Sequence, residues 1–248
     1  MGYQKSSLHL ATLSIALCVA FTPLYFQTPQ LGAQPLYVSI KFPRTPVGSP
    51  RSSIGGATRS PISCLRSNST LIVLSPQSNV ITTVSAQPTF FWYIPKTPAK
   101  SAKFVVSDQQ GQLVYQTTLT LKGIPGVVKL SLPKNVALDT GQEYDWKFGL
   151  TCNPDNESEN IAVEGSLKRT GLTSAQRNQL AAAKQPLKKA EVYAKAGIWQ
   201  ETISILAQLR HDRPSDRNIN AAWKELLESV ELKEIANAPL VECCRADN

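Results

Sequence analysis

The feature that most constrains the fold is a strict alternation of apolar and polar residues in the stretch "GQEYDWKFGLTC". Successive side chains of a β-strand point to opposite faces of its sheet, so this pattern predicts a strand with one buried and one solvated face. The buried face would be formed by Tyr144, Trp146, Phe148, Leu150 and Cys152, and the solvated face by Asp145, Lys147, Gly149 and Thr151.

The same alternation recurs on both sides of this strand. "GVVKLSLP" and "IAVEGSLK" alternate in the same way, and further strands are expected at residues 70–74, 89–94, 103–107 and 112–120. Seven or eight short strands at this spacing are typical of an antiparallel β-sandwich. We therefore predict an Ig-like β-sandwich domain over residues 64–170.

The pattern changes to a helical period after residue 170. Between residues 173 and 244 apolar residues recur every three or four positions, as expected for helices with one buried face. Thr173 or Ser174 can cap the first helix, and Pro186 separates it from the second. The fold class predicted is α+β, with a small helical segment, residues 171–248, packed on the sandwich.

One predicted strand has apolar residues on both faces. In "TFFWYIP", Phe91 and Tyr93 point away from Phe90, Trp92 and Ile94. Two explanations are open: Phe91 and Tyr93 form an exposed aromatic platform for a ligand, or another part of the chain packs on them. We expect packing by the helical segment. Carbohydrate binding through Phe91, Tyr93 or Trp199 is the alternative.

The N-terminus has the features of a secretory signal peptide. Lys5 precedes an uncharged apolar run, which is followed by turn formers and the small residues Gly32 and Ala33. Residues 1–33 are therefore predicted to be a signal peptide that is cleaved after Ala33, with an uncleaved membrane anchor as the alternative. Removing Lys5 from 26 Lys and Arg leaves 25 against 18 Asp and Glu, a formal charge of +7.

Residues 34–63 are predicted to be a flexible basic linker. From residue 41 to 63 the chain has four prolines, three glycines, four Lys or Arg and no acidic residue. Such a composition buries too little apolar surface to offset its ordering entropy. It could contact an anionic envelope surface, although a solvated tether is the simpler interpretation.

The four cysteines of the mature chain predict two disulfides. They are Cys64, Cys152, Cys243 and Cys244, and an even number in an exported chain favours disulfides over zinc. A bond between the adjacent cysteines would require a strained ring. We therefore expect one bond from each of Cys243 and Cys244 to the sandwich, to Cys64 and Cys152 in either order.

The search for catalytic, cofactor and metal sites predicts none. The G-x-S-x-G motif of hydrolases and the phosphate-binding loops are absent from the sequence. His211 is expected to lie at a helix C-terminus, where a partial positive charge suits the helix dipole. Asp155, Glu157 and Glu159 could ligate calcium, but a solvated hairpin tip is favoured. Nucleic-acid binding is improbable for an exported chain.

Two resemblances add to these patterns. "AEVYAKAGIWQETISILAQLRHDRP" resembles one tetratricopeptide helix pair, although Thr202 occupies the position where that motif has a small residue. "PTFFWYIP", "GIPGVVKLSLP", "YDWKFGLTC", "VEGSLKR" and "APLVECC" together resemble the cyanobacterial exported family known as domain of unknown function 928. That resemblance implies an envelope protein of unassigned activity and supplies no catalytic residue.

The function expected from the sequence is therefore that of a non-catalytic exported envelope protein. Its partner would be a protein or polymer of the periplasm or cell envelope. An enzyme of unrecognised type is a further alternative.

Overall fold

The computed structural model of the chain describes residues 1–2, 38–43, 64–65, 69–77, 80–242 and 245–246. The chain divides into two units, Met1–Leu36 and Tyr37–Asn248, and all the elements below belong to the second. Several sequence predictions lie outside the described residues: the signal peptide after Gly2, residues 44–63 of the linker, and Cys243 and Cys244.

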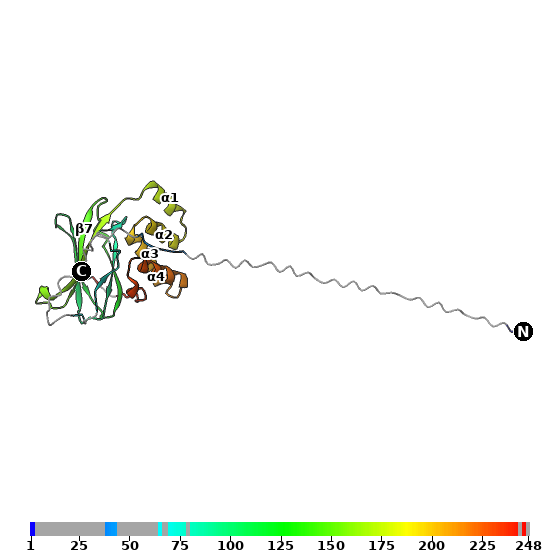
Figure 1. The fold of residues 1–248 in the computed structure, drawn as a ribbon, viewed down its shortest axis with the longest axis horizontal. Helices are drawn as coiled ribbons and strands as arrows, with labels where there is room; N and C mark the ends of the chain where they lie inside the picture. Colours follow the sequence, from blue (N-terminus) through cyan, green and yellow to red (C-terminus); the bar gives the residue numbers. More distant parts are fainter. Residues whose placement is uncertain (3–37, 44–63, 66–68, 78–79, 243–244, 247–248) are drawn as a thin grey trace. The chain divides into compact units, whose positions relative to one another are not determined.

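Two sheets make up the first part of the fold (Figure 1). Sheet A has the order β1-β3-β6 and sheet B the order β2-β8-β7-β4-β5-β9. The strands are β1 (Ile72–Val73), β2 (Val80–Thr83), β3 (Thr89–Ile94), β4 (Ser101–Asp108), β5 (Leu113–Thr120), β6 (Gly126–Ser131), β7 (Glu143–Thr151), β8 (Ile161–Arg169) and β9 (Arg245–Ala246).

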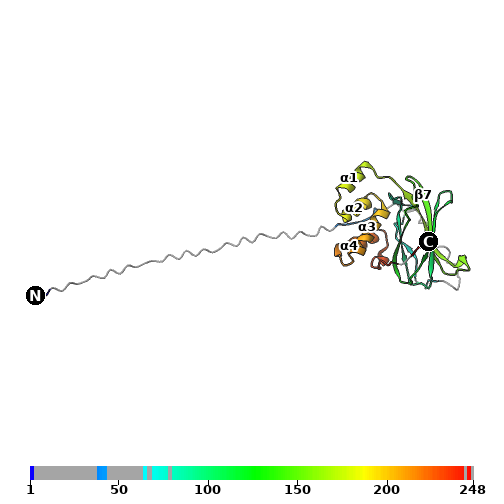
Figure 2. The same cartoon turned by 180° about the vertical axis from the view of Figure 1, so that it is seen from behind.

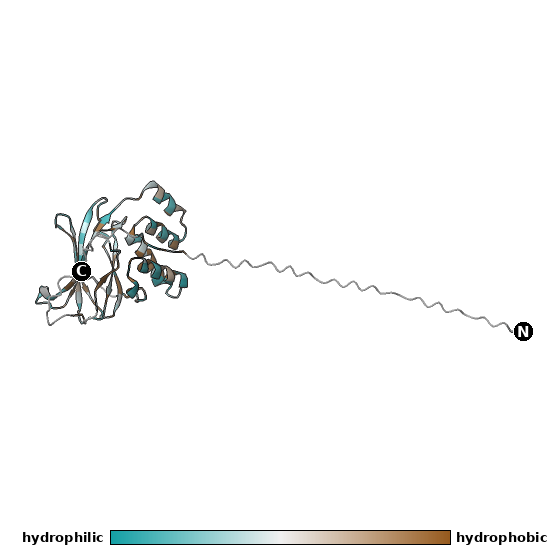
Figure 3. Ribbon diagram, in the orientation of Figure 1, coloured by the Kyte–Doolittle hydropathy of each residue, from teal (hydrophilic) through white to brown (hydrophobic). Residues whose placement is uncertain are grey.

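The sheets pack face to face through large aromatic side chains. The Trp92 ring of β3 stacks on the Phe148 ring of β7, with centroids 4.1 Å apart, and Phe90 contacts Phe104 of β4 at 4.9 Å. Trp92, Phe104 and Phe148 are fully buried, and both the strands and the helices carry hydrophobic stretches (Figure 3). The predicted buried face of β7 is confirmed at Tyr144, Trp146, Phe148 and Leu150, whereas Cys152 follows the strand and is half-buried.

One edge of sheet B differs from the predicted antiparallel pairing. β2 pairs in parallel with β8, with Val80 opposite Ser166 and Thr83 opposite Arg169. The sequence analysis did not predict β2, because "VITT" is short and its side chains do not alternate clearly between apolar and polar. A parallel pair needs a long crossover connection, and here strands β3 to β7 lie between the two partners in sequence. The other pairs of named strands are antiparallel.

Four helices follow the strands: α1 (Ser174–Ala182), α2 (Pro186–Lys195), α3 (Trp199–Asp212) and α4 (Arg217–Ser229). Thr173 caps α1 in a capping box with Gln176, and Pro186 begins α2, as predicted. The turn between α2 and α3 uses Gly197 at a φ of 71°, a conformation that other residues adopt with strain. Among the described residues, none of the helices is long and apolar enough to cross a membrane.

Helices cover the outer face of sheet A, as the two views in Figures 1 and 2 show, and the C-terminal segment extends the β6 edge of the sheet, where Leu240 pairs in parallel with Val127. On β6, Lys129 Nζ donates to Gln208 Oε1 of α3 at 3.5 Å. Val127 exchanges backbone hydrogen bonds with the segment after α4, at Pro239 and Val241. The indole N–H of Trp199, at the start of α3, donates to the Leu74 carbonyl at 2.8 Å. The predicted packing of the helical segment on the sandwich is confirmed.

The described part of the predicted linker is packed, which corrects the sequence prediction for residues 38–43. Val38, Ile40 and Phe42 are buried, whereas Ser39 and Lys41 are exposed. This is the alternation of an extended segment with one buried face. The prediction failed here because composition was averaged over a long window that also contained the proline-rich stretch after Pro43.

Candidate functional site

The outer face of sheet B carries exposed polar side chains. Side chains on β4, β7 and β8 alternate, so the partners of the buried residues point away from the sandwich core. On β7 these are Asp145 and Lys147, and on β8 Glu164; all three are exposed. The sequence pattern had placed Asp145 and Lys147 on the solvated face, which is confirmed.

A groove of about 260 Å³ crosses the three central strands on this face. We call it the sheet B groove. It is lined by Val105, Ser107, Asp145, Trp146, Lys147, Glu164, Gly165 and Ser166. The groove is open to solvent along one side, so a ligand there would be held against a sheet surface rather than enclosed.

Strand register explains why these residues meet. Lys147 is opposite Val105 on β4 and opposite Glu164 on β8. One pair further along, Asp145 is opposite Ser166, whose hydroxyl donates to Asp145 Oδ1 at 2.6 Å. Directly paired side chains have Cβ atoms about 4.5–5.5 Å apart, so the carboxylates, the ammonium group and the hydroxyl form one compact polar set.

The backbone beneath the groove depends on the absence of a side chain at Gly165. A Cβ at this position would lie 2.7 Å from Cζ2 of Trp146, well inside normal contact. Gly165 therefore lets β8 lie close against a buried indole ring. The floor of the groove is fixed by this contact, while Lys147 and Glu164 at its surface remain exposed.

The chemistry available in the groove is hydrogen bonding to polar groups. Asp145 and Glu164 offer carboxylate acceptors, Lys147 offers an ammonium donor, and the Ser107 hydroxyl can serve in either role. Within the described part of the chain, no group of three or more His, Cys, Asp or Glu side chains is arranged to hold a metal ion. We therefore assign no metal or cofactor to the groove.

The aromatic residues singled out from the sequence lie elsewhere and are covered. Phe91 is 3% exposed and Tyr93 is half-buried, on the face of sheet A that the helices cover. Trp199 is fully buried. Phe91 is therefore covered and Tyr93 half-covered, as expected if another part of the chain packs on them, and the two rings do not form an exposed platform.

The disulfide differs from the prediction. The structure joins Cys64 to Cys152, with Cα atoms 5.3 Å apart, so the expectation that both cysteines bond to the C-terminal pair is wrong. That expectation rested on the strain of a ring between adjacent cysteines, an argument that applies only if every cysteine is bonded. Backbone pairing links the tail to the sandwich, because Ala246 of β9 pairs with Leu119 of β5.

The remaining candidate residues have structural surroundings. His211 lies in the last turn of α3, as predicted, and lines a small cavity of about 30 Å³ beside β6. Between β7 and β8, the Glu159 carboxylate accepts hydrogen bonds from the amides of Asn153 and Asn156 at 3.1 and 2.9 Å. These bonds occupy the carboxylate and close the loop. Asp155 and Glu157 are exposed in the same loop, in agreement with the predicted solvated tip.

Sequence reasoning missed the groove as a site although it had assigned several of its residues to solvated faces. Ser107 and Ser166 were not singled out, because a serine on a strand has no distinctive signal. The residues that line the groove come from three strands: β7 and β8 follow each other in sequence, whereas β5 and β6 lie between β4 and β7, so the pairing of β4 with β7 completes the set. A predicted pairing of β4 with β7 and of β7 with β8 would have been the signal needed.

Comparison with known proteins identifies the family. The family model described as Domain of Unknown Function (DUF928) matches residues 54–240 of the 248-residue chain. None of the curated proteins compared matches the chain. The match begins before the first strand and includes both sheets up to β8 and all four helices. The chain therefore belongs to the DUF928 family.

Proposed function

We propose that this chain is a non-catalytic exported envelope protein whose Ig-like sandwich binds a hydroxyl-rich polymer in the sheet B groove. The observation that supports this function is the groove itself, a hollow of about 260 Å³ across exposed central strands, with carboxylate, ammonium and hydroxyl groups among its lining side chains. Large sheet faces that stay exposed in a folded domain are commonly used for binding, whereas the opposite sheet here is covered by helices.

The chemistry of the groove favours a polar polymer over an apolar peptide. Asp145, Lys147, Glu164 and Ser107 offer acceptors and donors in close succession, and Val105 is the aliphatic side chain among the lining residues. Sugar hydroxyls can both donate to carboxylates and accept from an ammonium group. An open groove also admits a chain that continues past both ends. Polysaccharide of the cell envelope is therefore the polymer that we propose.

Export is part of the proposal. The N-terminal pattern of basic, apolar and small residues predicts a cleaved signal peptide, and a Cys64–Cys152 disulfide suits an oxidising compartment. We expect the mature protein to begin at Gln34. N-terminal sequencing of protein purified from its native source tests this, and an intact Lys5 would contradict it.

Co-sedimentation of the mature protein with insoluble envelope polysaccharide tests the binding function. The groove variant replaces Lys147 and Glu164, which are opposite each other on β7 and β8, with alanine. The control variant replaces Glu143 and Lys168 with alanine. These two residues are opposite each other at the start of β7 and near the end of β8, and they do not line the groove. Each variant removes one positive and one negative charge, so the net charge is unchanged.

The two variants make the experiment specific to the groove. We expect the groove variant to bind about tenfold more weakly, the effect of about 1.4 kcal/mol of lost contact energy. The control variant should bind like the wild type. Equal affinity of both variants and the wild type would show that the groove does not bind this polymer.

A further inference from the structure

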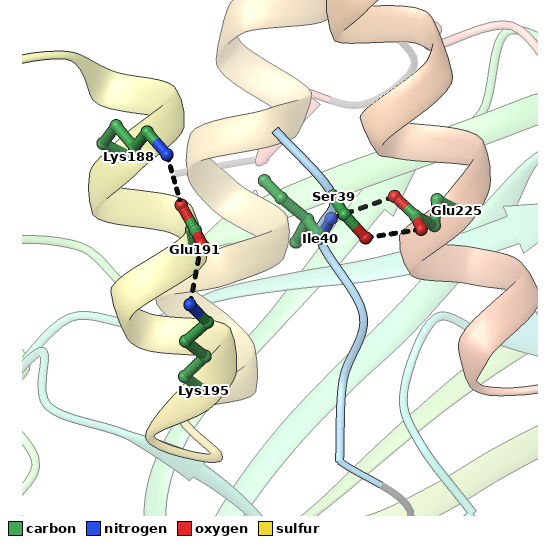
Figure 4. A network of polar contacts seen from close by, with 6 residues as sticks. All are labelled: Ser39, Ile40, Lys188, Glu191, Lys195 and Glu225. Atoms are coloured by element: carbon green, nitrogen blue, oxygen red, sulfur yellow. Dashed lines mark hydrogen bonds and ion pairs between the residues drawn. The ribbon is translucent and has the colours of Figure 1, made fainter. Parts of the chain in front are cut away.

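A short extended segment near the predicted mature N-terminus lies along helix α4. The backbone N–H of Ile40 donates to Glu225 Oε2 at 3.0 Å, and the Ser39 hydroxyl donates to Glu225 Oε1 at 2.7 Å (Figure 4). The backbone N–H of Phe42 donates to the hydroxyl of Ser229 at 2.9 Å. Two alternate amides of the segment are thus held by two side chains of one helix.

The spacing of these contacts follows from the geometry of the two elements. Alternate amides of an extended chain are about 6.6 Å apart, at about 3.3 Å per residue. Residues i and i+4 of a helix lie about 6 Å apart along its axis, at 1.5 Å per residue. Glu225 and Ser229 have this i, i+4 relation, so their side chains match the amides of Ile40 and Phe42. The match depends on the backbone and is independent of the side chains of the segment.

Side-chain recognition comes from the buried face of the segment. Ile40 is fully buried, and Val38 and Phe42 are 4% and 7% exposed. The Phe42 ring packs edge-on against Trp199, with centroids 5.1 Å apart. Lys41 points outward, with its side chain 70% exposed and its ammonium 3.5 Å from Glu225. The surface therefore selects for apolar residues at alternate positions.

We propose that this surface is a peptide-binding site that residues 38–42 occupy in cis. We call it the α4 site and define it by Trp199, Glu225 and Ser229. Its ligand class is an extended peptide with apolar side chains at alternate positions and free backbone amides at those same residues. This mode resembles recognition of an extended peptide by main-chain hydrogen bonds and side-chain pockets, with a helix in place of a sheet edge.

The chain connects this ligand to the sandwich through residues 44–63, ahead of the disulfide at Cys64. Binding of a segment that belongs to the same chain is intramolecular, so its effective concentration at the site exceeds that of a free peptide in dilute solution. A segment that binds only weakly as a free peptide would therefore fill the site almost completely when tethered. A partner peptide of the same pattern would have to displace it.

Peptide binding in trans tests the proposal on the full mature chain. The probe is a fluorescein-labelled peptide of residues 34–45, followed by anisotropy. Ile40→Asp in the chain should empty the site, because a charged side chain does not tolerate the burial that Ile40 has. We expect this variant to bind the probe at least tenfold more tightly than the wild type. Lys103→Gln, at an exposed position of β4 away from the α4 site, is the control and should behave like the wild type.

Two further variants show whether the contacts are those of the α4 site. Adding Glu225→Ala to Ile40→Asp should abolish probe binding, and a probe that itself carries Ile40→Asp should not bind. Near-ultraviolet circular dichroism establishes that each chain is folded. A folded Ile40→Asp chain that fails to bind the wild-type probe would overturn the proposal.

A second measurement covers the case in which Ile40→Asp prevents folding. A protease site introduced between residues 44 and 63 allows the segment to be cut after the wild-type chain has folded. Excess labelled probe should then replace the cut segment, and the label should co-elute with the protein on gel filtration. If the cut chain takes up no label, the segment is a fixed part of the fold and the α4 site is not a binding site.

Discussion

Removing the carboxylate of Glu201 should loosen the junction between the helices and the sandwich. Glu201 lies in the first turn of α3. Its Oε1 accepts hydrogen bonds from the Thr83 hydroxyl at 2.7 Å, the Val84 amide at 3.0 Å and the Ser85 amide at 2.9 Å. Three donors, one at the end of β2 and two in the residues that follow it, therefore converge on one oxygen.

The size of the effect follows from these contacts. A hydrogen bond to a charged group stabilises a protein by about 1.5–3 kcal/mol, and such contributions do not add when they share one acceptor. The second oxygen, Oε2, is buried without a hydrogen-bond partner among the described residues, which offsets part of the gain. We expect Glu201→Ala to lower the free energy of unfolding by about 3 kcal/mol. Glu201→Gln, which keeps a carbonyl acceptor, should cost about 1 kcal/mol.

Thermal and urea denaturation of the mature chain measure this change. For a domain of this size, 1 kcal/mol corresponds to about 2–4 °C in Tm, so Glu201→Ala should lower Tm by about 6–12 °C. Glu228→Ala is the control, because Glu228 pairs with Lys224 at 3.8 Å on the surface of α4 and should contribute less than about 0.5 kcal/mol. If Glu201→Ala is no more destabilising than Glu228→Ala, the converging hydrogen bonds do not hold the junction.

Three other changes probe separate parts of the fold. Replacing Cys64 and Cys152 with serine opens a loop with a sequence separation of 88. The free energy of unfolding, measured in urea, should fall by up to about 4–5 kcal/mol. An unchanged urea midpoint would argue against this pairing. Gly165→Ala places a methyl group 2.7 Å from the ring of Trp146 and should cost about 1–3 kcal/mol in the same assay, whereas a neutral effect would show that β8 can shift. The hydrogen bond from Lys195, opposed by burial and assisted by Lys188, holds the pKa of Glu191 below its ordinary value of 4.5 (Figure 4). The stabilisation by the Glu191 carboxylate is therefore present above pH 4.5 and is lost as the pH falls through the lowered pKa. The difference in urea midpoint between the wild type and Glu191→Gln should accordingly shrink below pH 4.5. A difference that grows below pH 4.5 would contradict this assignment.

Much of the sandwich was predictable because local patterns determine it. The alternation in β7 identified its buried face, and the two apolar faces of β3 led to the expectation that another element packs on Phe91 and Tyr93, with an exposed platform as the alternative. Capping by Thr173 and the break at Pro186 located the start of α1 and of α2. Each of these features depends on residues that are neighbours in sequence.

The features that escaped prediction depend on residues that are distant in sequence. The parallel pairing of β2 with β8 and the residue set of the sheet B groove require the strand register, which periodicity does not supply. The contacts of Ile40 with Glu225 join positions 185 residues apart. The disulfide partner of Cys64 was predicted wrongly for a related reason, since chain entropy hardly distinguishes loops of such similar length.

Hydrogen exchange of the mature protein with and without envelope polysaccharide tests the proposed function most directly. If the polymer binds in the sheet B groove, added polysaccharide should slow amide exchange in the central strands β4, β7 and β8 and leave α4 unchanged. The control is the variant in which Lys147 and Glu164 are replaced with alanine. Added polysaccharide should not slow amide exchange in the strands of this variant. Slower exchange confined to the helices, with sheet B unchanged, would contradict the account.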